Sequence, residues 1–122
     1  MRAVEGKQRE AWLAGFAADA VLEDPVGHAP LRQGAGAIAD FWDTAIAGME
    51  AVRFEIRRVH EGPREALLLA DVTARAPGGA IASYDAAVHY TFDDAGRIVS
   101  LRAFWDLPAV VAQLTAPGSP SG

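Results

Sequence analysis

Apolar residues recur at helical spacing in two segments of the first half of the chain. Over residues 8–17, Trp12, Leu13 and Phe16 are three or four positions apart, which places them on one face of a predicted helix. Residues 35–47 have the same spacing and predict a second helix. Its apolar face consists of Ile38, Phe41, Trp42 and Ile46.

After residue 50 the apolar period changes from 3.6 to 2, which is typical of β-strands. The alternation predicts long strands over residues 52–57, 68–75, 81–92 and 97–105. Turn sequences rich in glycine, proline and aspartate separate the later strands, and a shorter strand precedes Pro25. The order helix, strand, helix and four long strands predicts an α+β fold, in which a curved antiparallel sheet has helices packed on one face.

The length and composition indicate one globular domain. The chain has 122 residues, of which 51% are hydrophobic and 22% are charged, as in an ordinary globular protein. We expect a single domain over residues 1–114 and a disordered tail over residues 115–122, which are rich in proline, glycine and serine.

Charge and hydropathy narrow the range of partners and locations. The net charge is −5 and Lys7 is the only lysine, so nucleic acid is a poor candidate partner. No apolar run approaches the roughly 20 residues of a membrane span. The first six residues are too few and too polar for a signal peptide, and the chain has no cysteine, so we expect a cytoplasmic location.

Asp24 is the strongest candidate for a chemical role. Strand alternation places it on the same face as Ala20 and Leu22, and a carboxylate among apolar side chains has its pKa raised by desolvation. Such a carboxylate at a strand end suits proton abstraction. The alternative is that Asp24 only caps the turn before Pro25.

Neither a metal nor a cofactor is expected. The three histidines are far apart and lack metal-ligand spacing. The Gly34-Ala35-Gly36-Ala37 segment opens a helix but lacks the patterns of phosphate-binding and dinucleotide-binding loops.

A family resemblance rests on three blocks of the sequence. They are residues 16–27, which contain the string Glu-Asp-Pro-Val-Gly, residues 34–42 and residues 90–105. The chain resembles the steroid Δ-isomerase, or SnoaL-like, branch of the nuclear transport factor 2-like superfamily from residue 6 to about residue 110. The resemblance implies a cone-shaped, cystatin-like fold: a curved sheet wrapped around helices, with an apolar pocket at one end. The N-terminal helix of the family is shortened or missing here.

The resemblance also implies catalytic roles. Asp24 matches the general base that moves a proton along an apolar keto-compound, such as a steroid or a polyketide, without a cofactor. The enolate formed needs hydrogen-bond donors. At the position of the family's donor aspartate this chain has Val88. The family's donor tyrosine lies on the N-terminal helix that is shortened or missing here, so both customary donors are absent. Tyr90, on the same face of the strand as Val88, is the replacement candidate, unless it is a core aromatic with its hydroxyl satisfied at the rim.

An apolar wall around Asp24 is expected to bind the ligand. Its members are Phe16, Phe41, Trp42, Val72, Tyr84, Val88, Leu101, Ala103 and Trp105. The Trp105 indole is a candidate to hold the Asp24 carboxylate, or it only packs against its neighbours. The convex face of the sheet mixes polar and apolar groups, and relatives commonly dimerise there, so the resemblance implies a homodimer.

The sequence is also compatible with other functions. The loss of both customary donors favours a non-catalytic binding protein for a small hydrophobic ligand. A polyketide cyclase-type enzyme is a further alternative, because the fold hosts several chemistries. The third alternative is a dimerisation module in which the protein's own side chains fill the pocket.

Overall fold

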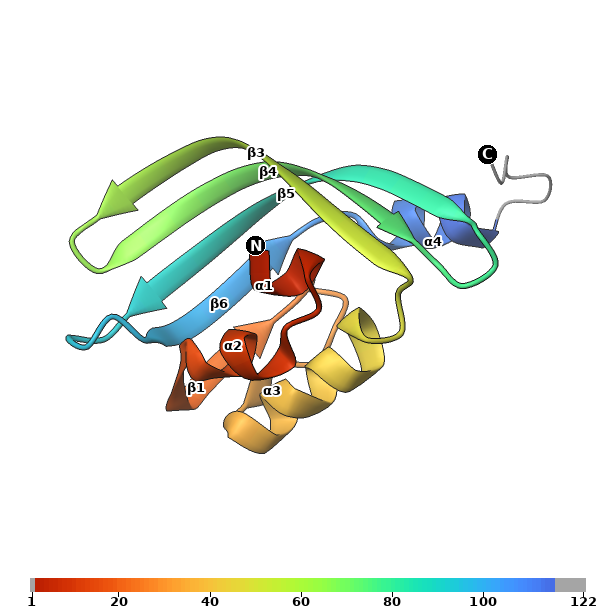
Figure 1. Cartoon of the computed structure of the whole chain (residues 1–122). Helices are drawn as coiled ribbons and strands as arrows, with labels where there is room; N and C mark the ends of the chain where they lie inside the picture. Colours follow the sequence, from red (N-terminus) through yellow and green to blue (C-terminus); the bar gives the residue numbers. More distant parts are fainter. Residues whose placement is uncertain (1, 116–122) are drawn as a thin grey trace.

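The computed structural model describes residues 2–115. Of the expected tail, residues 115–122, Thr115 is the last residue of a helix, and residues 116–122 lie outside the described residues. The elements are α1 (Arg2–Glu5), α2 (Arg9–Ala14), β1 (Phe16–Glu23), β2 (Arg32–Gln33), α3 (Ala35–Phe41), the π-helical turn η1 (Trp42–Ile46), β3 (Ala51–Gly62), β4 (Glu65–Arg75), β5 (Ile81–Phe92), β6 (Ile98–Phe104) and α4 (Leu107–Thr115). In Figure 1, β3, β4 and β5 arch over α1, α2 and α3, and α4 lies at one end of the arch. Within the described residues, every helix is too short or too polar to cross a bilayer.

The strands form one six-stranded sheet in the order β2-β1-β6-β5-β4-β3. All neighbouring strands are antiparallel except β1 and β6, which run parallel with Leu22 opposite Leu101 and Glu23 opposite Arg102. The predicted α+β fold with a curved sheet is confirmed, and the parallel pair makes the sheet mixed. Because β1 lies beside β6, the residue after β1 lies close to the end of β6.

The first predicted helix is shorter than its apolar spacing suggested. α2 ends at Ala14, and Phe16 begins β1, where it pairs with Ile98. The Gly15 carbonyl accepts a hydrogen bond from the Ile98 amide at 2.8 Å. A buried aromatic residue at a strand start satisfies the same three- and four-residue spacing, so the pattern alone misplaced Phe16. The expected shortening of the N-terminal helix is confirmed by α1, which has four residues.

The second predicted helix is present, but its last turn is wider than an α-helical turn. Ile38, Phe41 and Trp42 are 1%, 8% and 3% exposed, so the predicted apolar face is confirmed. The Ala47 amide donates to the Trp42 carbonyl at 2.8 Å, a bond across five residues that defines a π-helical turn. Arg9 pairs with Asp43 at 2.9 Å and ties α2 to this turn.

The strand β3 runs well beyond the predicted residues 52–57 and ends at Gly62. Ile56 and Val59 are both 47% exposed, because this half of the hairpin lies outside the core. A strand exposed on both faces loses the alternation that marks it in a sequence. The predicted glycine turns are confirmed, with φ of +97° at Gly78 and +80° at Gly96.

We expect Leu22 to be among the residues on which stability depends most. It is 1% exposed, so Leu22→Ala should lower the free energy of unfolding by about 2–5 kcal/mol through lost burial and a cavity. Leu67 is 37% exposed, so the control Leu67→Ala should cost less than about 1 kcal/mol. Urea unfolding of both variants measures the difference, and equal losses would contradict this core assignment.

Candidate active site

Strand β1 and the chain that follows it place Asp24 at the inner face of the sheet. Ala20 and Leu22 are 0% and 1% exposed, so the strand face that they were predicted to share with Asp24 is turned toward the core. The Val26 amide donates to the Ala103 carbonyl at 2.8 Å and holds this segment against β6. Asp24 therefore lies beside the C-terminal end of β6.

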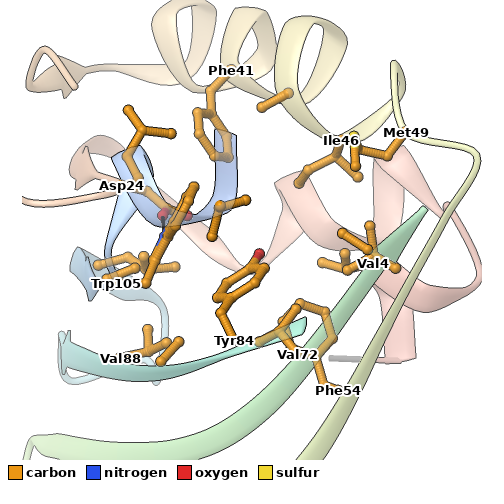
Figure 2. Close-up of a pocket in the computed structure, with 18 of the residues that line it drawn as sticks. Val4, Asp24, Phe41, Ile46, Met49, Phe54, Val72, Tyr84, Val88 and Trp105 are labelled. Atoms are coloured by element: carbon orange, nitrogen blue, oxygen red, sulfur yellow. Dashed lines mark hydrogen bonds between the residues drawn. The ribbon is translucent and has the colours of Figure 1, made fainter. Parts of the chain in front are cut away.

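The Asp24 carboxylate is held by the Trp105 side chain, which follows β6. The Trp105 Nε1–H donates to Asp24 Oδ1 at 2.5 Å, and Figure 2 shows the indole nitrogen next to the carboxylate. Burial raises the pKa of Asp24 to about 6, and the Trp105 hydrogen bond partly opposes this rise by stabilising the ionised form. An acid with a pKa near 6 both accepts and returns protons close to neutral pH.

A pocket of about 250 Å³ opens beside Asp24, and apolar side chains form most of its wall. Among the lining residues of the described chain, Asp24 is the only carboxylate. The lining includes most of the residues expected from the sequence: Asp24, Phe41, Val72, Tyr84, Val88, Tyr90, Leu101, Ala103 and Trp105.

Phe16 and Trp42 were also expected in the wall, but neither lines the pocket. Both are buried and pack against Trp12, with ring centroids 4.7 Å and 5.2 Å from the Trp12 ring. Trp12 itself lines the pocket, so it takes the position expected of them. Periodicity identified the apolar face of each helix but not which member of the face reaches the cavity.

The structure also adds lining residues that the sequence pattern did not assign to the wall. They are Val4, Trp12, Ala45, Ile46, Met49, Val52, Phe54, Ala74, Ala86, Leu107, Val110, Val111 and Leu114. The alternation of Val52 with Phe54 and the helical spacing of Val110 with Leu114 were available signals. Val4 had none, since α1 reaches the pocket through a tertiary contact in which the Phe54 amide donates to Glu5 Oε2 at 2.7 Å.

Two tyrosines of β5 bring hydroxyl groups to this pocket. Burial, and secondly the negative charge of Asp24, raise the pKa of both Tyr84 and Tyr90 to about 12, so both stay protonated donors. The Tyr84 ring lies 5.0 Å from the Trp105 ring, and the Tyr90 ring stacks on Phe92 at 6.0 Å. Among the described residues, neither hydroxyl is a fully buried polar atom without a hydrogen-bond partner.

The position of Val88 leaves a gap in the polar groups around Asp24. Val88 pairs with Ala103 in the β5–β6 register, next to the segment that carries Asp24, and it is 7% exposed. A valine here packs but donates no hydrogen bond. Within residues 2–115, His, Asp and Glu side chains form no group of three or more that could hold a metal ion.

Comparisons with known proteins agree with this geometry. The model of the SnoaL-like domain family matches residues 1–101. A steroid Delta-isomerase from Nocardioides simplex is 40% identical over 103 residues, which are 84% of this chain and 80% of that protein.

Solved structures share the fold over most of the chain. A Delta 5-3-ketosteroid isomerase from Mycobacterium sp. is 33% identical with a TM-score of 0.79, and the match covers 88% of each chain. A Mycobacterium tuberculosis protein solved in complex with estradiol-17beta-hemisuccinate is 28% identical with a TM-score of 0.80, again over 88% of each chain. A computationally designed 17-OHP binder is 27% identical with a TM-score of 0.80, over 88% of each chain.

The raised pKa of Asp24 predicts a pH-dependent stability. In the folded protein the pKa of Asp24, about 6, exceeds the ordinary value, so folding favours the protonated side chain. Its contribution to the free energy of unfolding is complete below about pH 4 and is lost as pH rises through about 6. Asp24→Asn has no carboxylate to ionise, so its free energy of unfolding should not show this loss. Between pH 4 and pH 8 the free energy of unfolding of the native protein should therefore fall by up to about 3 kcal/mol more than that of the variant.

Urea unfolding at a series of pH values tests this expectation. Asp19→Asn is the matched control, because Asp19 lies on the same strand and is exposed. This control should follow the native pH dependence. Parallel curves for the native protein and Asp24→Asn would contradict the raised pKa.

Proposed function

The chain belongs to the family of SnoaL-like domains, and on this basis we propose that it is a cofactor-independent proton-transfer enzyme. Its relatives support an isomerase-like or cyclase-like role. The proposed substrate is an apolar keto-compound, such as a steroid or a polyketide, and the proposed reaction is the shift of a double bond, as in ketosteroid isomerases. The observation that carries the proposal is one partly buried carboxylate, Asp24, in the wall of an otherwise apolar pocket.

In the proposed reaction Asp24 is the general base. The carboxylate takes a proton from the carbon between the ketone and the double bond, and the electron pair of that C–H bond forms a dienolate. The carboxylic acid then returns the same proton to a carbon farther along the conjugated system. The base is regenerated, so no cofactor or metal takes part. The Trp105 hydrogen bond orients the carboxylate through both steps.

The dienolate oxygen needs aimed hydrogen-bond donors. Ketosteroid isomerases supply a tyrosine and a protonated aspartate, and the position of that aspartate is Val88 in this chain. We propose that Tyr90, two positions along β5 on the same face, donates to the oxygen instead. Its hydroxyl stays protonated because burial raises the pKa of Tyr90 to about 12.

A binding role without catalysis is the second candidate. The valine at position 88 favours it, because the site lacks one donor that the reaction requires. Structural relatives also include a designed binder of 17-OHP and a protein solved with an estradiol derivative. In this case Asp24→Asn should change ligand affinity little, and no ketone should be converted.

The quaternary structure and the location stay predictions. We propose a homodimer formed through the convex face of β5 and β6, where Phe104 is 41% exposed beside Arg102. Apolar surface of this kind often marks an association site. A cytoplasmic location is the accompanying expectation.

Asp24→Asn is the principal test of the catalytic proposal. The change keeps the shape of the side chain and removes its basicity, so kcat on β,γ-unsaturated ketones should fall by about 10²–10⁴-fold. Ultraviolet absorbance of the conjugated product measures the rate. In the native protein kcat/KM should rise with pH through about 6, where Asp24 ionises, and then level off. Asp19→Asn should behave as the native protein, and full activity of Asp24→Asn would refute the base assignment.

Tyr90→Phe tests the replacement donor. The loss of one donor to the enolate oxygen should lower kcat by about 10²–10³-fold, while the ring and its stacking on Phe92 remain. The same absorbance assay measures the effect, with circular dichroism as the check on folding. A change of less than about threefold in kcat would identify Tyr90 as a core aromatic, since removing an aimed donor costs far more.

A further inference from the structure

The negative charge of Asp24 has no positive partner in the pocket. No lysine, arginine or histidine of the described chain lines this cavity. Burial raises the pKa of Asp24, the Trp105 hydrogen bond partly lowers it, and no cationic side chain of residues 2–115 contributes. A carboxylate in an apolar environment is normally paired, because an isolated ion there is unfavourable. The ionised site therefore favours a ligand that brings a positive charge.

The charged side chains that flank the Asp24 segment do not enter the pocket. Glu23 and Arg102 pair with each other at 3.2 Å, and neither lines the cavity. His28, in the loop after Asp24, is exposed and lies outside the lining as well. Arg32 donates to a backbone carbonyl at 3.4 Å and is likewise absent from the lining. A ligand cation would thus meet the carboxylate without a competing cation.

The electrostatic potential of the pocket is negative when Asp24 is ionised. Burial, and secondly the charge of Asp24, raise the pKa of Tyr84 and Tyr90 to about 12, so both titratable neighbours in the lining stay neutral near pH 7. The field of Asp24 therefore reaches both tyrosines of β5. Val88, between them on the strand, adds no donor that would offset this field. Such a potential attracts a cation and repels an anion.

Aromatic rings line the cavity into which the carboxylate opens. The Tyr84 ring lies 5.0 Å from the Trp105 ring, whose indole donates to Asp24. Figure 2 shows Phe41 and Tyr84 directed into the same cavity. The aromatic lining residues are Trp12, Phe41, Phe54, Tyr84, Tyr90 and Trp105. Ring faces attract cations, most strongly where water is excluded, so the rings reinforce the preference of the carboxylate.

The remaining wall determines what the rest of the ligand must be. Figure 2 shows Val4, Ile46 and Met49 on the side of the cavity opposite to Asp24. These side chains carry no charge and no strong hydrogen-bonding group, so they cannot solvate an ion. The charged group of a ligand therefore belongs at Asp24, and an apolar body belongs in the remainder of the pocket.

We propose that the pocket binds an apolar amine in its protonated form, with an ammonium N–H donating to the Asp24 carboxylate and with the rings of Tyr84 and Trp105 beside the charge. The ligand class is a primary, secondary or tertiary amine with a compact hydrocarbon body. The contact is a charge-assisted hydrogen bond, which is stronger than a neutral one. The amine occupies the same carboxylate as the proposed ketone substrate and excludes it, but its binding requires no turnover.

A matched pair of ligands isolates the effect of the charge. Aminoadamantane is a cation near neutral pH, and hydroxyadamantane, substituted at the same bridgehead carbon, has the same cage without the charge. Equilibrium dialysis gives the Kd of each for the native protein, Asp24→Asn and Asp19→Asn. The readout is the ratio of the alcohol Kd to the amine Kd within each protein, which a general loss of folded protein does not change.

We expect the native protein at neutral pH to bind the amine about 10–100-fold more tightly than the alcohol, the range of a hydrogen bond to a charged group. Asp24→Asn should lower this ratio to about one or below, because the carboxamide has no charge. Asp19→Asn, the same change at an exposed position of β1, should keep the native ratio. Equal binding of both ligands by the native protein would overturn the proposal, as would an undiminished ratio in Asp24→Asn.

The pH dependence of binding is an independent check. The affinity for the amine should rise with pH through about 6, where Asp24 ionises, and then level off, because below this pH the free protein carries the protonated acid. The Kd of the alcohol should stay constant over the same range. An amine Kd that does not change with pH would refute the ion pair with Asp24.

Two substitutions of Tyr84 test the aromatic part of the site. Tyr84→Leu removes the ring face, so the preference for the amine should fall by about 2–30-fold. Tyr84→Phe keeps the ring and is the matched control, which should retain the native ratio. Equal ratios in the two variants would refute the contribution of this ring.

The failure of this proposal is distinguishable from the failure of the proposed function. If the amine preference is present and depends on Asp24 while no ketone is converted, the amine site stands and the proposed reaction falls. If Asp24→Asn abolishes turnover while the native protein binds both ligands equally, the amine site is refuted and the base remains.

Discussion

The desolvation of a single carboxylate is the constraint on which the site depends. Asp24 loses water contacts because it follows a strand whose alternate residues, Ala20 and Leu22, are buried in the core. The Trp105 hydrogen bond compensates only partly, so the pKa of Asp24 stays raised, at about 6. The folded protein thus tolerates an acid that is less stable when ionised, and the same feature suits the general-base role that we propose for this residue. In that proposal, stability and reactivity oppose each other at Asp24.

The mixed sheet is what brings the parts of the site together. The parallel pairing of β1 with β6 places Asp24 beside the chain that leads to Trp105, although the two residues are 81 positions apart in sequence. β5 then adds Val88 and both tyrosines from the other side of β6. Helices α1 and α4 close the pocket with apolar side chains such as Val4 and Val110. No single element contains the site, so its geometry depends on the register of three strands.

The polar groups of the pocket are few among its lining residues. Trp105 positions the carboxylate, and the hydroxyls of Tyr90 and Tyr84 lie toward different ends of β5. Val88 leaves one position beside Asp24 without a donor. Because the remaining wall is apolar, an oxygen atom of the proposed ligand would find a partner at few places, and these places would determine how the ligand is oriented.

The sequence by itself determined the fold class, the family and the position of Asp24. These follow from local patterns: the change of period from 3.6 to 2, the buried alternation before Pro25 and three motifs in order. The tertiary structure decided the lining of the pocket. It replaced Phe16 and Trp42 by Trp12, and it added Val4, because a periodic pattern identifies an apolar face but not the neighbour that covers it. From the sequence, Trp105 could either hold the Asp24 carboxylate or only pack against its neighbours. The structure decides for the hydrogen bond, because the register of β1 and β6 sets the distance between two residues that lie far apart in the chain.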